Sequence, residues 1–482
     1  MLDLRPILFV IGVLTATFGA GMLVPALIEI AQQTVEWRVF LSSAGLTLFV
    51  GLGLAISNRG TGEALNIRQA FLLTTALWVV LPAFGAVPFV FSEINLSFTD
   101  AYFEAMSGVT TTGSTVLTGL DDAPAGILVW RALLQWFGGI GIIVMAVAVL
   151  PMLRVGGMQL FRMESSDTSE KILPRAAQIA GAITALYVGL SALCMFALIV
   201  AGLTPFDAAA HAMTTIATGG FSTSDLSIGK FENFGAEMII VAFMVIGSLP
   251  FVLYLQVIRG RPLALWRDTQ VRGFFLIAAT IVLLMILWLV VFKDFAPGDA
   301  FRYGTFNAVS IMTGTGYTST DYGAWGAFSI TAFFFIMFIG GCAGSTSCGI
   351  KIFRFQVLVS AIIVRLKQHN RPHGVFAPHY NRRPVPENVV SSVMSFLFLF
   401  VVSFIVLSLA LTATGVDYVT AMSGAGTALA NVGPGLGEVI GPAGTFQPLP
   451  ASAKWLLSFG MVLGRLELFT VLVLITPAFW RG

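Results

Sequence analysis

The sequence is poor in charged residues, and this scarcity excludes an ordinary soluble fold. Only 10% of the 482 residues are Asp, Glu, Lys or Arg, whereas soluble domains carry about 25%. The net charge of +2 gives no indication of nucleic-acid binding. The three cysteines, Cys194, Cys342 and Cys348, give neither a disulfide framework nor the ligand spacing of a zinc site. His369 and His373 do not form a metal site, because Pro372 interrupts any helix that would align them.

Motifs for catalysis and for nucleotide binding are also missing from the sequence. It contains no Walker motif and no dinucleotide fingerprint, and the glycine-rich stretch 433–437 is not preceded by a strand. No Ser/His, Cys/His or metal-ligand group falls at one depth of the expected helices. We therefore expect a protein that is not an enzyme and that binds no cofactor. If ATP, ADP or NAD acts on it, the nucleotide is expected on a partner.

Long apolar runs dominate the chain, with 57% hydrophobic residues. Helices of about twenty apolar residues can cross a hydrocarbon layer of about 30 Å. The first run is too long for a cleaved signal peptide. We predict an all-α polytopic protein in membrane lipid, with ten spans at about 5–29, 38–57, 70–91, 125–152, 176–202, 236–258, 273–293, 325–365, 389–413 and 452–478.

The placement of charge predicts an orientation for these spans. Basic residues gather in three connecting segments, 154–175, 259–272 and 365–383, and the alternate segments are acidic or nearly uncharged. Basic connections remain on the cytoplasmic side of a membrane. Both termini are then cytoplasmic, which agrees with Arg5 and Arg481.

Four short segments rich in threonine, serine and glycine separate the apolar runs. Their central glycines lie 107, 96 and 117 residues apart, so the repeat is about one hundred residues long. Four copies of one strand can close a ring of backbone carbonyls, which replaces the hydration shell of a potassium ion. The alternative is a set of ordinary outer loops. We predict a filter formed by Thr111, Thr112, Gly113, Thr218, Gly219, Gly220, Gly314, Thr315, Gly316, Asn431, Val432 and Gly433.

A run of about ten residues, too short to span, precedes each filter segment. We predict half-helices that enter from outside and begin near Thr99-Asp100, Asp207, Asp299 and Asp417. Their carboxyl ends carry partial negative charge and favour a cation. The expected architecture is four helix–pore-helix–filter–helix repeats around one pore, at residues 63–160, 161–262, 263–370 and 371–482, after two additional helices in residues 1–62.

The eighth apolar run is too long to be one helix. Its 41 residues would extend roughly 60 Å, and small residues fill its middle. We predict a broken helix whose loop lies on the cytoplasmic side of the filter and acts as a gate. Close helix packing is the alternative explanation. The gate residues are Gly340, Gly341, Cys342, Ala343, Gly344, Ser345, Thr346, Ser347, Cys348, Gly349 and Lys351. Lys351 is either an electrostatic barrier or an anchor at the cytoplasmic interface.

Arg465 is unusual because it is a charged residue within an apolar run. It follows Lys454 by eleven positions and so lies roughly 16 Å along the last helix, near the middle of the membrane. Glu467 points to another face and is a poor partner for it. Carbonyls and hydroxyls of the gate loop are better partners, and a buried ion pair with another acid is the alternative.

These motifs together resemble the Trk/Ktr/HKT superfamily of potassium transporters, and bacterial Trk-type membrane subunits in particular. The resemblance rests on the four filter segments, Gln135–Gly141, the Gly340–Lys351 loop and Gly464–Glu467, and it covers nearly the whole chain. It implies potassium uptake across the inner (plasma) membrane, a homodimer with one pore per subunit, and control by a TrkA-like cytoplasmic nucleotide-binding ring. In plant relatives a serine at the first filter glycine accompanies sodium selectivity, whereas this chain has Gly113.

Two alternatives remain open from the sequence. One is a proton- or sodium-coupled potassium symporter, which needs a carboxylate buried at mid-span. No clear candidate is present, Glu467 being the doubtful exception. The other is a sodium-permeable member of the same superfamily.

Overall fold

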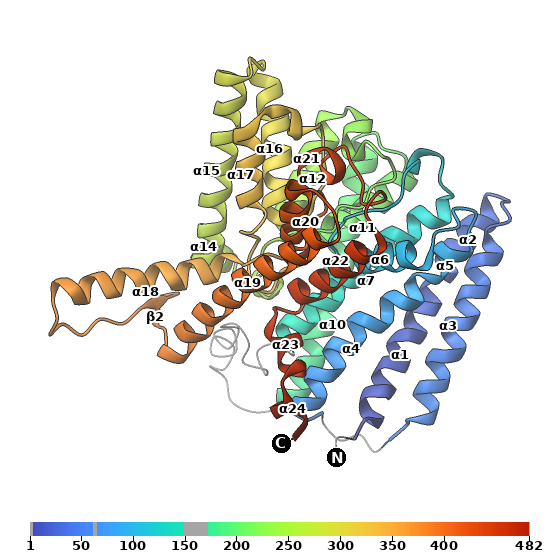
Figure 1. The fold of residues 1–482 in the computed structure, drawn as a ribbon, viewed down its shortest axis with the longest axis horizontal. Helices are drawn as coiled ribbons and strands as arrows, with labels where there is room; N and C mark the ends of the chain where they lie inside the picture. Colours follow the sequence, from blue (N-terminus) through green and yellow to red (C-terminus); the bar gives the residue numbers. More distant parts are fainter. Residues whose placement is uncertain (1–2, 61–64, 149–171, 482) are drawn as a thin grey trace.

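The computed structural model describes residues 3–60, 65–148 and 172–481, and this part of the chain is mainly helical, as predicted. The basic segment 154–175 lies largely outside the described residues. The strands in the described residues are β1 (His379–Tyr380) and β2 (Arg383–Pro384), which form an antiparallel pair. Figure 1 shows both termini at the same end of the molecule.

The N-terminal part forms a helical hairpin beside the repeats. It consists of α1 (Arg5–Gly21), which continues into α2 (Leu23–Ala31), and α3 (Trp37–Ser57). Gly12 and Gly51 lie where the two helices approach most closely, since a Cβ added to Gly12 would lie 2.7 Å from the Gly51 carbonyl oxygen. Small residues at such crossings allow close packing between membrane helices. The hairpin lies at one edge of the molecule, next to α4 (Figure 1).

The remainder repeats one plan four times: a first helix, a short pore helix, an irregular segment and a second helix. The first helices are α4 (Ile67–Gly85) with α5 (Val87–Phe91), α10 (Ile172–Val200), α15 (Thr269–Phe292) and α19 (Glu387–Ala413). The pore helices are α6 (Phe98–Val109), α11 (Pro205–Ile216), α16 (Pro297–Thr313) and α20 (Tyr418–Ala430). The second helices are α7 (Ala125–Ala148), α12 (Phe234–Gly247) with α13 (Phe251–Ile258), α17 (Ala327–Ile336) with α18 (Ile352–Asn370), and α22 (Ala451–Arg465) with α23 (Phe469–Ile475).

Short helices occupy several of the connections. They are η1 (Leu120–Asp122), η2 (Ser227–Phe231), α14 (Ala264–Arg267), η3 (Tyr322–Trp325), α21 (Gly437–Ile440) and α24 (Pro477–Arg481).

Three of the four pore helices start slightly earlier than the sequence predicts. Ser97 and Thr204 cap α6 and α11 by accepting the amide hydrogens of Asp100 and Asp207, so these aspartates lie inside the first turn. Asp417 caps α20, as predicted. The third pore helix, α16, begins at Pro297 and has 17 residues, compared with 12 or 13 in the others.

The prediction of ten spans needs correction in two places, where a run expected to be one straight helix is bent. Among the described residues, seven helices are long and apolar enough to cross a membrane, or nine if each of two bent pairs counts as one. The expected run 236–258 bends by 93° between α12 and α13, and 452–478 bends by 115° between α22 and α23. Pro250 lies at the first bend and has no amide hydrogen to continue the helix. The eighth run is broken, as predicted, and its first part, α17, has only ten residues.

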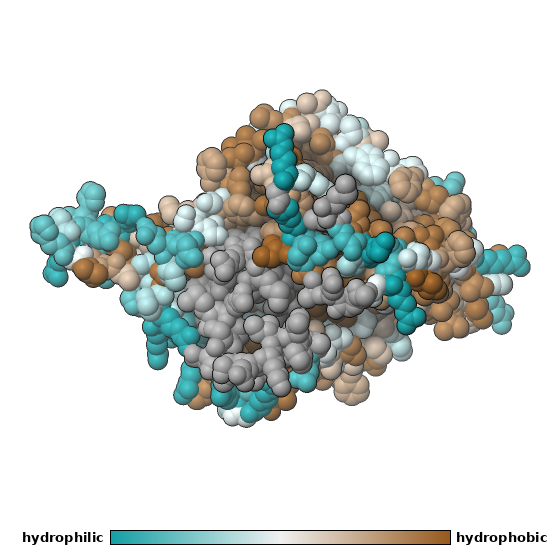
Figure 2. Space-filling model, turned by 90° about the horizontal axis from the view of Figure 1, so that it is seen from below, coloured by the Kyte–Doolittle hydropathy of each residue, from teal (hydrophilic) through white to brown (hydrophobic). Residues whose placement is uncertain are grey.

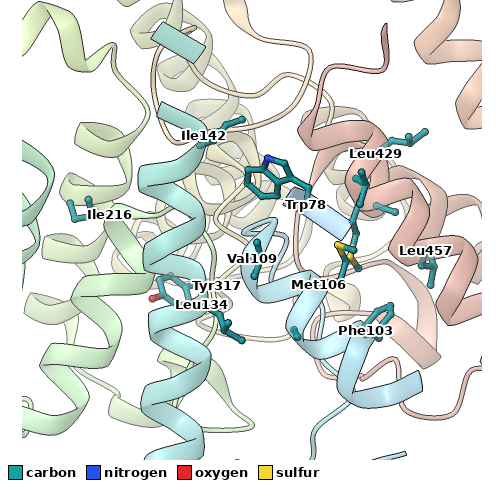
Figure 3. Packing of buried hydrophobic residues seen from close by; sticks show 14 of the residues in the cluster. Trp78, Phe103, Met106, Val109, Leu134, Ile142, Ile216, Tyr317, Leu429 and Leu457 are labelled. Carbon is teal, nitrogen blue, oxygen red and sulfur yellow. The ribbon is translucent and has the colours of Figure 1, made fainter. Parts of the chain in front are cut away.

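The first pore helix is packed on all sides by the bundle. Figure 3 shows Phe103, Met106 and Val109 of α6 lying between α7 and the C-terminal helices, close to Leu134 and Leu457. All five side chains are buried. Dense apolar packing of this kind fixes the position of the helix, and therefore of the segment that follows it.

One helix leaves the bundle. In Figure 1, α18 projects sideways from the remaining helices, and α19 brings the chain back. Apolar side chains on α18 are largely exposed, including Val359 (55%), Ile362 (57%) and Leu366 (62%). Figure 2 shows hydrophilic residues gathered on the projecting end of the molecule.

Candidate ion pathway and gate

The four filter segments (residues 111–115, 218–222, 314–318 and 431–435, numbered 1 to 4) have closely matching backbones. The first residue of each has a positive φ: Thr111 (52°), Thr218 (49°), Gly314 (80°) and Asn431 (51°). Threonine rarely adopts this conformation, so its presence at equivalent positions indicates a backbone held by its surroundings. Gly113, Gly220 and Gly316 also have positive φ values, of 88°, 79° and 83°, whereas Gly433 does not.

The segments meet in cyclic order. A Cβ added to Gly113 would clash with the Gly219 carbonyl, and one added to Gly220 would clash with the Thr315 carbonyl. A Cβ on Gly316 would lie 2.7 Å from the Gly433 nitrogen, and one on Gly433 would lie 3.0 Å from the Gly113 carbonyl oxygen. The structure thus brings the predicted filter residues into one closed ring. Coordination of potassium by their carbonyls stays a prediction.

Buried side chains join neighbouring segments through contacts that have no local signal in the sequence. Ser114 Oγ donates to the Gly433 carbonyl (2.8 Å), and Asn431 Nδ2 donates to Thr112 Oγ1 (3.0 Å). The Tyr317 hydroxyl hydrogen-bonds with Thr214 of the preceding repeat. These bonds restrict movement of one segment relative to the next.

The 340–351 loop lies against the inner end of the filter. Ser347 Oγ donates to the Thr313 carbonyl (2.5 Å), directly before filter segment 3. The Cys342 and Thr346 amides donate to the carbonyls of Ser248 (2.9 Å) and Gly247 (3.2 Å), where α12 bends into α13. The loop is irregular and almost wholly buried, so a continuous close-packed helix is excluded. Positive φ values at Gly340, Gly344 and Gly349 shape its turns.

Arg465 holds this loop from the opposite side. Its guanidinium donates to the Thr346 carbonyl (3.4 Å), to the Cys348 sulfur and to the Gly138 carbonyl on α7 (3.3 Å). The side chain is 2% exposed. Among the described residues no carboxylate lies within ion-pair distance of Arg465. The expected carbonyl partner is confirmed, no loop hydroxyl bonds to Arg465, and the ion-pair alternative is wrong for this part of the chain.

Lys351 belongs to a buried charge cluster that the sequence did not reveal. Its Nζ lies 3.1 Å from Glu467 Oε1, and Arg354 donates to the other oxygen of that carboxylate. Lys351 is 4% exposed, so an exposed anchor at the interface does not describe it, and its role as an electrostatic barrier stays a prediction. Lys351, Glu467 and Leu468 all have positive φ values, of 75°, 56° and 58°. The cluster therefore joins the break before α18 to the break before α23.

The buried carboxylates of the described residues are all engaged. Glu104, Glu237 and Glu467 form ion pairs with arginine or lysine side chains. Glu29 accepts hydrogen bonds from the Gly126 amide and the Thr34 hydroxyl. In this part of the chain, each buried carboxylate therefore has at least one hydrogen-bond or ion-pair partner.

Acidic side chains line a cavity of about 610 Å³ near the start of α7 and α11, among them Glu29, Glu36, Asp121, Asp122 and Asp207. Burial raises the pKa of Glu36. A hydrogen bond from Lys230 lowers the pKa of Asp121. The excess of carboxylates makes this end of the molecule favourable for cations.

Four equivalent re-entrant segments that close one ring inside a bundle of apolar helices define a multi-pass, channel-like membrane protein. The model of the TrkH family, described as a cation transport protein, matches residues 38–481. The chain belongs to this family.

Close relatives and a solved structure agree along the full length. The chain is 45% identical to the Trk system potassium uptake protein TrkI of Halomonas elongata, over 99% of this chain and 97% of that protein. It is 40% identical to the Trk system potassium uptake protein TrkH of Escherichia coli, over 99% of both chains. The crystal structure of the potassium transporter TrkH from Vibrio parahaemolyticus superposes with a TM-score of 0.93, at 38% identity and over 100% of both chains.

Proposed function

We propose that this protein takes up potassium across the inner membrane through a channel-like pore. The observation that carries the proposal is the closed ring of four filter segments, each beginning with a residue of positive φ. Such a backbone can direct successive carbonyls toward a common axis, where they replace the hydration shell of the ion. The names of the full-length relatives support potassium as the transported ion.

The four pore helices supply the electrostatics of the filter. Each ends directly before its filter segment, so its partial negative charge lies at the ring and favours a cation. Two predicted ligands differ from the others, because the Gly219 carbonyl already accepts a hydrogen bond from Gln135 (2.6 Å) and the Gly433 carbonyl accepts one from Ser114 (2.8 Å). In each of these carbonyls, the second lone pair is the one available to potassium.

The 340–351 loop is the gate in this proposal, and Arg465 restrains it. Ser347 of the loop hydrogen-bonds to the inner end of the filter, and Thr346 of the loop hydrogen-bonds to Arg465. The cavity beside Cys348, Arg465 and Glu467 has a volume of only about 10 Å³, roughly the space for one water molecule. A loop in this position obstructs an ion that has passed the filter, and opening requires the loop to move.

We further propose that the protein works as a homodimer under a TrkA-like cytoplasmic ring that binds the regulatory nucleotide. The exposed apolar side chains of the projecting α18 support a second copy as its partner. The basic segments 154–175, which lies largely outside the described residues, and 365–383 are the expected docking surface for the ring. Disulfide crosslinking of an Ile362→Cys variant tests the dimer. If no crosslink forms and the protein is a monomer by size-exclusion chromatography, the homodimer proposal is contradicted.

The central experiment is reconstitution of the purified protein into liposomes. We expect potassium and rubidium fluxes that follow the applied voltage, with much smaller sodium flux. Flux that needs a proton or sodium gradient identifies a coupled symporter, and equal potassium and sodium flux identifies a sodium-permeable transporter. Either result contradicts the selective-channel proposal.

A further inference from the structure

The contacts that hold filter segments 1 and 2 together differ from those at the two adjacent junctions of the ring, between segments 4 and 1 and between segments 2 and 3. Direct hydrogen bonds from Ser114 and Asn431 cross the junction between segments 4 and 1. The Tyr317 hydroxyl reaches from segment 3 to the pore helix before segment 2. Residues 111–116 and 218–222, all of them described, are instead bridged by side chains of α6 and α7.

One face of α7 binds three backbone groups of filter segment 2. Arg131 and Gln135 are four residues apart and so lie on the same face. Gln135 donates to the Gly219 carbonyl (2.6 Å) and accepts from the Phe221 amide (3.0 Å). Arg131 Nη1 donates to the Ser222 carbonyl (2.7 Å), and its guanidinium lies 4.1 Å from the centre of the Phe221 ring.

The same arginine is bonded to a carboxylate that holds the outer end of filter segment 1. Arg131 Nε donates to Glu104 Oε1 (2.8 Å). Glu104 Oε2 accepts the Val116 amide hydrogen (2.9 Å), and both oxygens lie 3.0 Å from the Thr115 hydroxyl. Glu104 is 0% exposed and Arg131 is 1% exposed.

We propose that Glu104, Arg131 and Gln135 are positioning residues that fix the spacing of filter segments 1 and 2 and thereby set selectivity for potassium over sodium. This inference rests on the proposed function of the filter. The attraction within a buried ion pair is largely offset by the loss of hydration, so its main contribution here is geometry. Gly219 is in close contact with Gly113, where an added Cβ would clash, so a shift of Gly219 moves the ring itself.

Two variants of similar side-chain size distinguish a role in positioning the filter from a role in folding. Arg131→Lys keeps the charge near Glu104 but loses the planar fork that reaches Ser222 and Thr115. Gln135→Met keeps the length but cannot bond to Gly219 or Phe221. We expect each to lower the potassium-to-sodium permeability ratio by about five- to tenfold. This ratio, from reversal potentials in liposomes, does not depend on how much protein folds.

The chain offers a matched control. Arg302 makes two hydrogen bonds of 2.8 Å to the buried Glu237 and contacts no filter segment. Arg302→Lys should therefore leave the ratio at the wild-type value. A ratio lowered equally by this control indicates a general loss of structure and overturns the inference.

The exchange Glu104→Arg with Arg131→Glu gives a second test. It restores a neutral buried pair, so protein yield should recover relative to Arg131→Glu alone, but the contacts to Val116 and Ser222 are not rebuilt and the ratio should stay low. If the potassium-to-sodium permeability ratio recovers fully, only the charge balance of the pair matters for selectivity, and the inference is then wrong. A non-selective wild type contradicts the proposed function, whereas a selective wild type with unchanged Arg131→Lys and Gln135→Met variants overturns this inference alone.

Discussion

Gly113 occupies a corner of the ring where a side chain has neither the space nor the backbone conformation it needs. Its φ is 88°, and an added Cβ would clash with the Gly219 carbonyl. We predict that Gly113→Ser displaces this corner and lowers the potassium-to-sodium permeability ratio by about tenfold, equivalent to roughly 1.4 kcal/mol. Reversal potentials in liposomes measure the ratio.

Gly119 is the control at the residue scale. It also has a positive φ, of 72°, but no atom lies within 4 Å of the position of its Cβ. Gly119→Ser should carry the same backbone cost without altering selectivity. A normal yield of Gly113→Ser with wild-type selectivity would count against the filter assignment.

Arg465 is the residue whose loss should open the gate. Its hydrogen bonds to Thr346 and Cys348 are charge-assisted, and together contribute about 1.5–3 kcal/mol. Arg465→Ala should raise the open-to-closed ratio by about ten- to a hundredfold and raise the rubidium flux in liposomes without a partner ring above the wild-type level. Arg302→Ala, which removes an arginine outside the loop contacts, should leave this flux at the wild-type level. Wild-type flux in Arg465→Ala would reduce this arginine to a structural role.

At the scale of elements, the gate loop is a separable unit. The amides of Ile350 and Lys351 donate to the carbonyls of Phe338 and Ile339, both at 2.9 Å, and hold the ends of the loop together. Removal of residues 342–347 should therefore leave a short turn and a pore that leaks rubidium without its partner. Combination with Arg465→Ala should add little, because both changes act on one element. Partner-free flux at the wild-type level after the deletion would show that the loop does not gate.

The elements that the sequence revealed are those that interrupt a helix with small residues. Glycine and threonine clusters marked the filter segments and the gate loop, because such residues are unfavourable within helices. The bend before α23 carries no such mark, since Leu466, Glu467 and Leu468 turn the chain with positive φ at two non-glycine residues. Pro250 was a usable signal for the bend before α13. The pairing of Glu104 with Arg131 depends on tertiary packing and had no local signal beyond the presence of charges in apolar runs.

At the scale of the whole molecule, the orientation in the membrane can be tested directly. Asp122, Asp225 and Arg371 are exposed, whereas the native cysteines Cys194, Cys342 and Cys348 are buried and should react slowly. Cysteine at Asp122 or Asp225 should react with an impermeant thiol reagent from outside, and cysteine at Arg371 only from inside. Labelling of intact and opened cells compares the two sides. A reversed pattern would place the filter at the wrong face.

Because all four corners of the ring come from one polypeptide, each corner is encoded separately. In a ring of four identical subunits, a single codon change is copied into every corner at once. Here the same change alters one corner and leaves three as they were, so a damaging mutation changes only one of the four filter segments. The corners are thus free to diverge one at a time, and the equivalent positions 112, 219, 315 and 432 already carry three residue types: threonine in Thr112 and Thr315, glycine in Gly219 and valine in Val432. Natural variation in ion preference can therefore arise in small steps within a single gene.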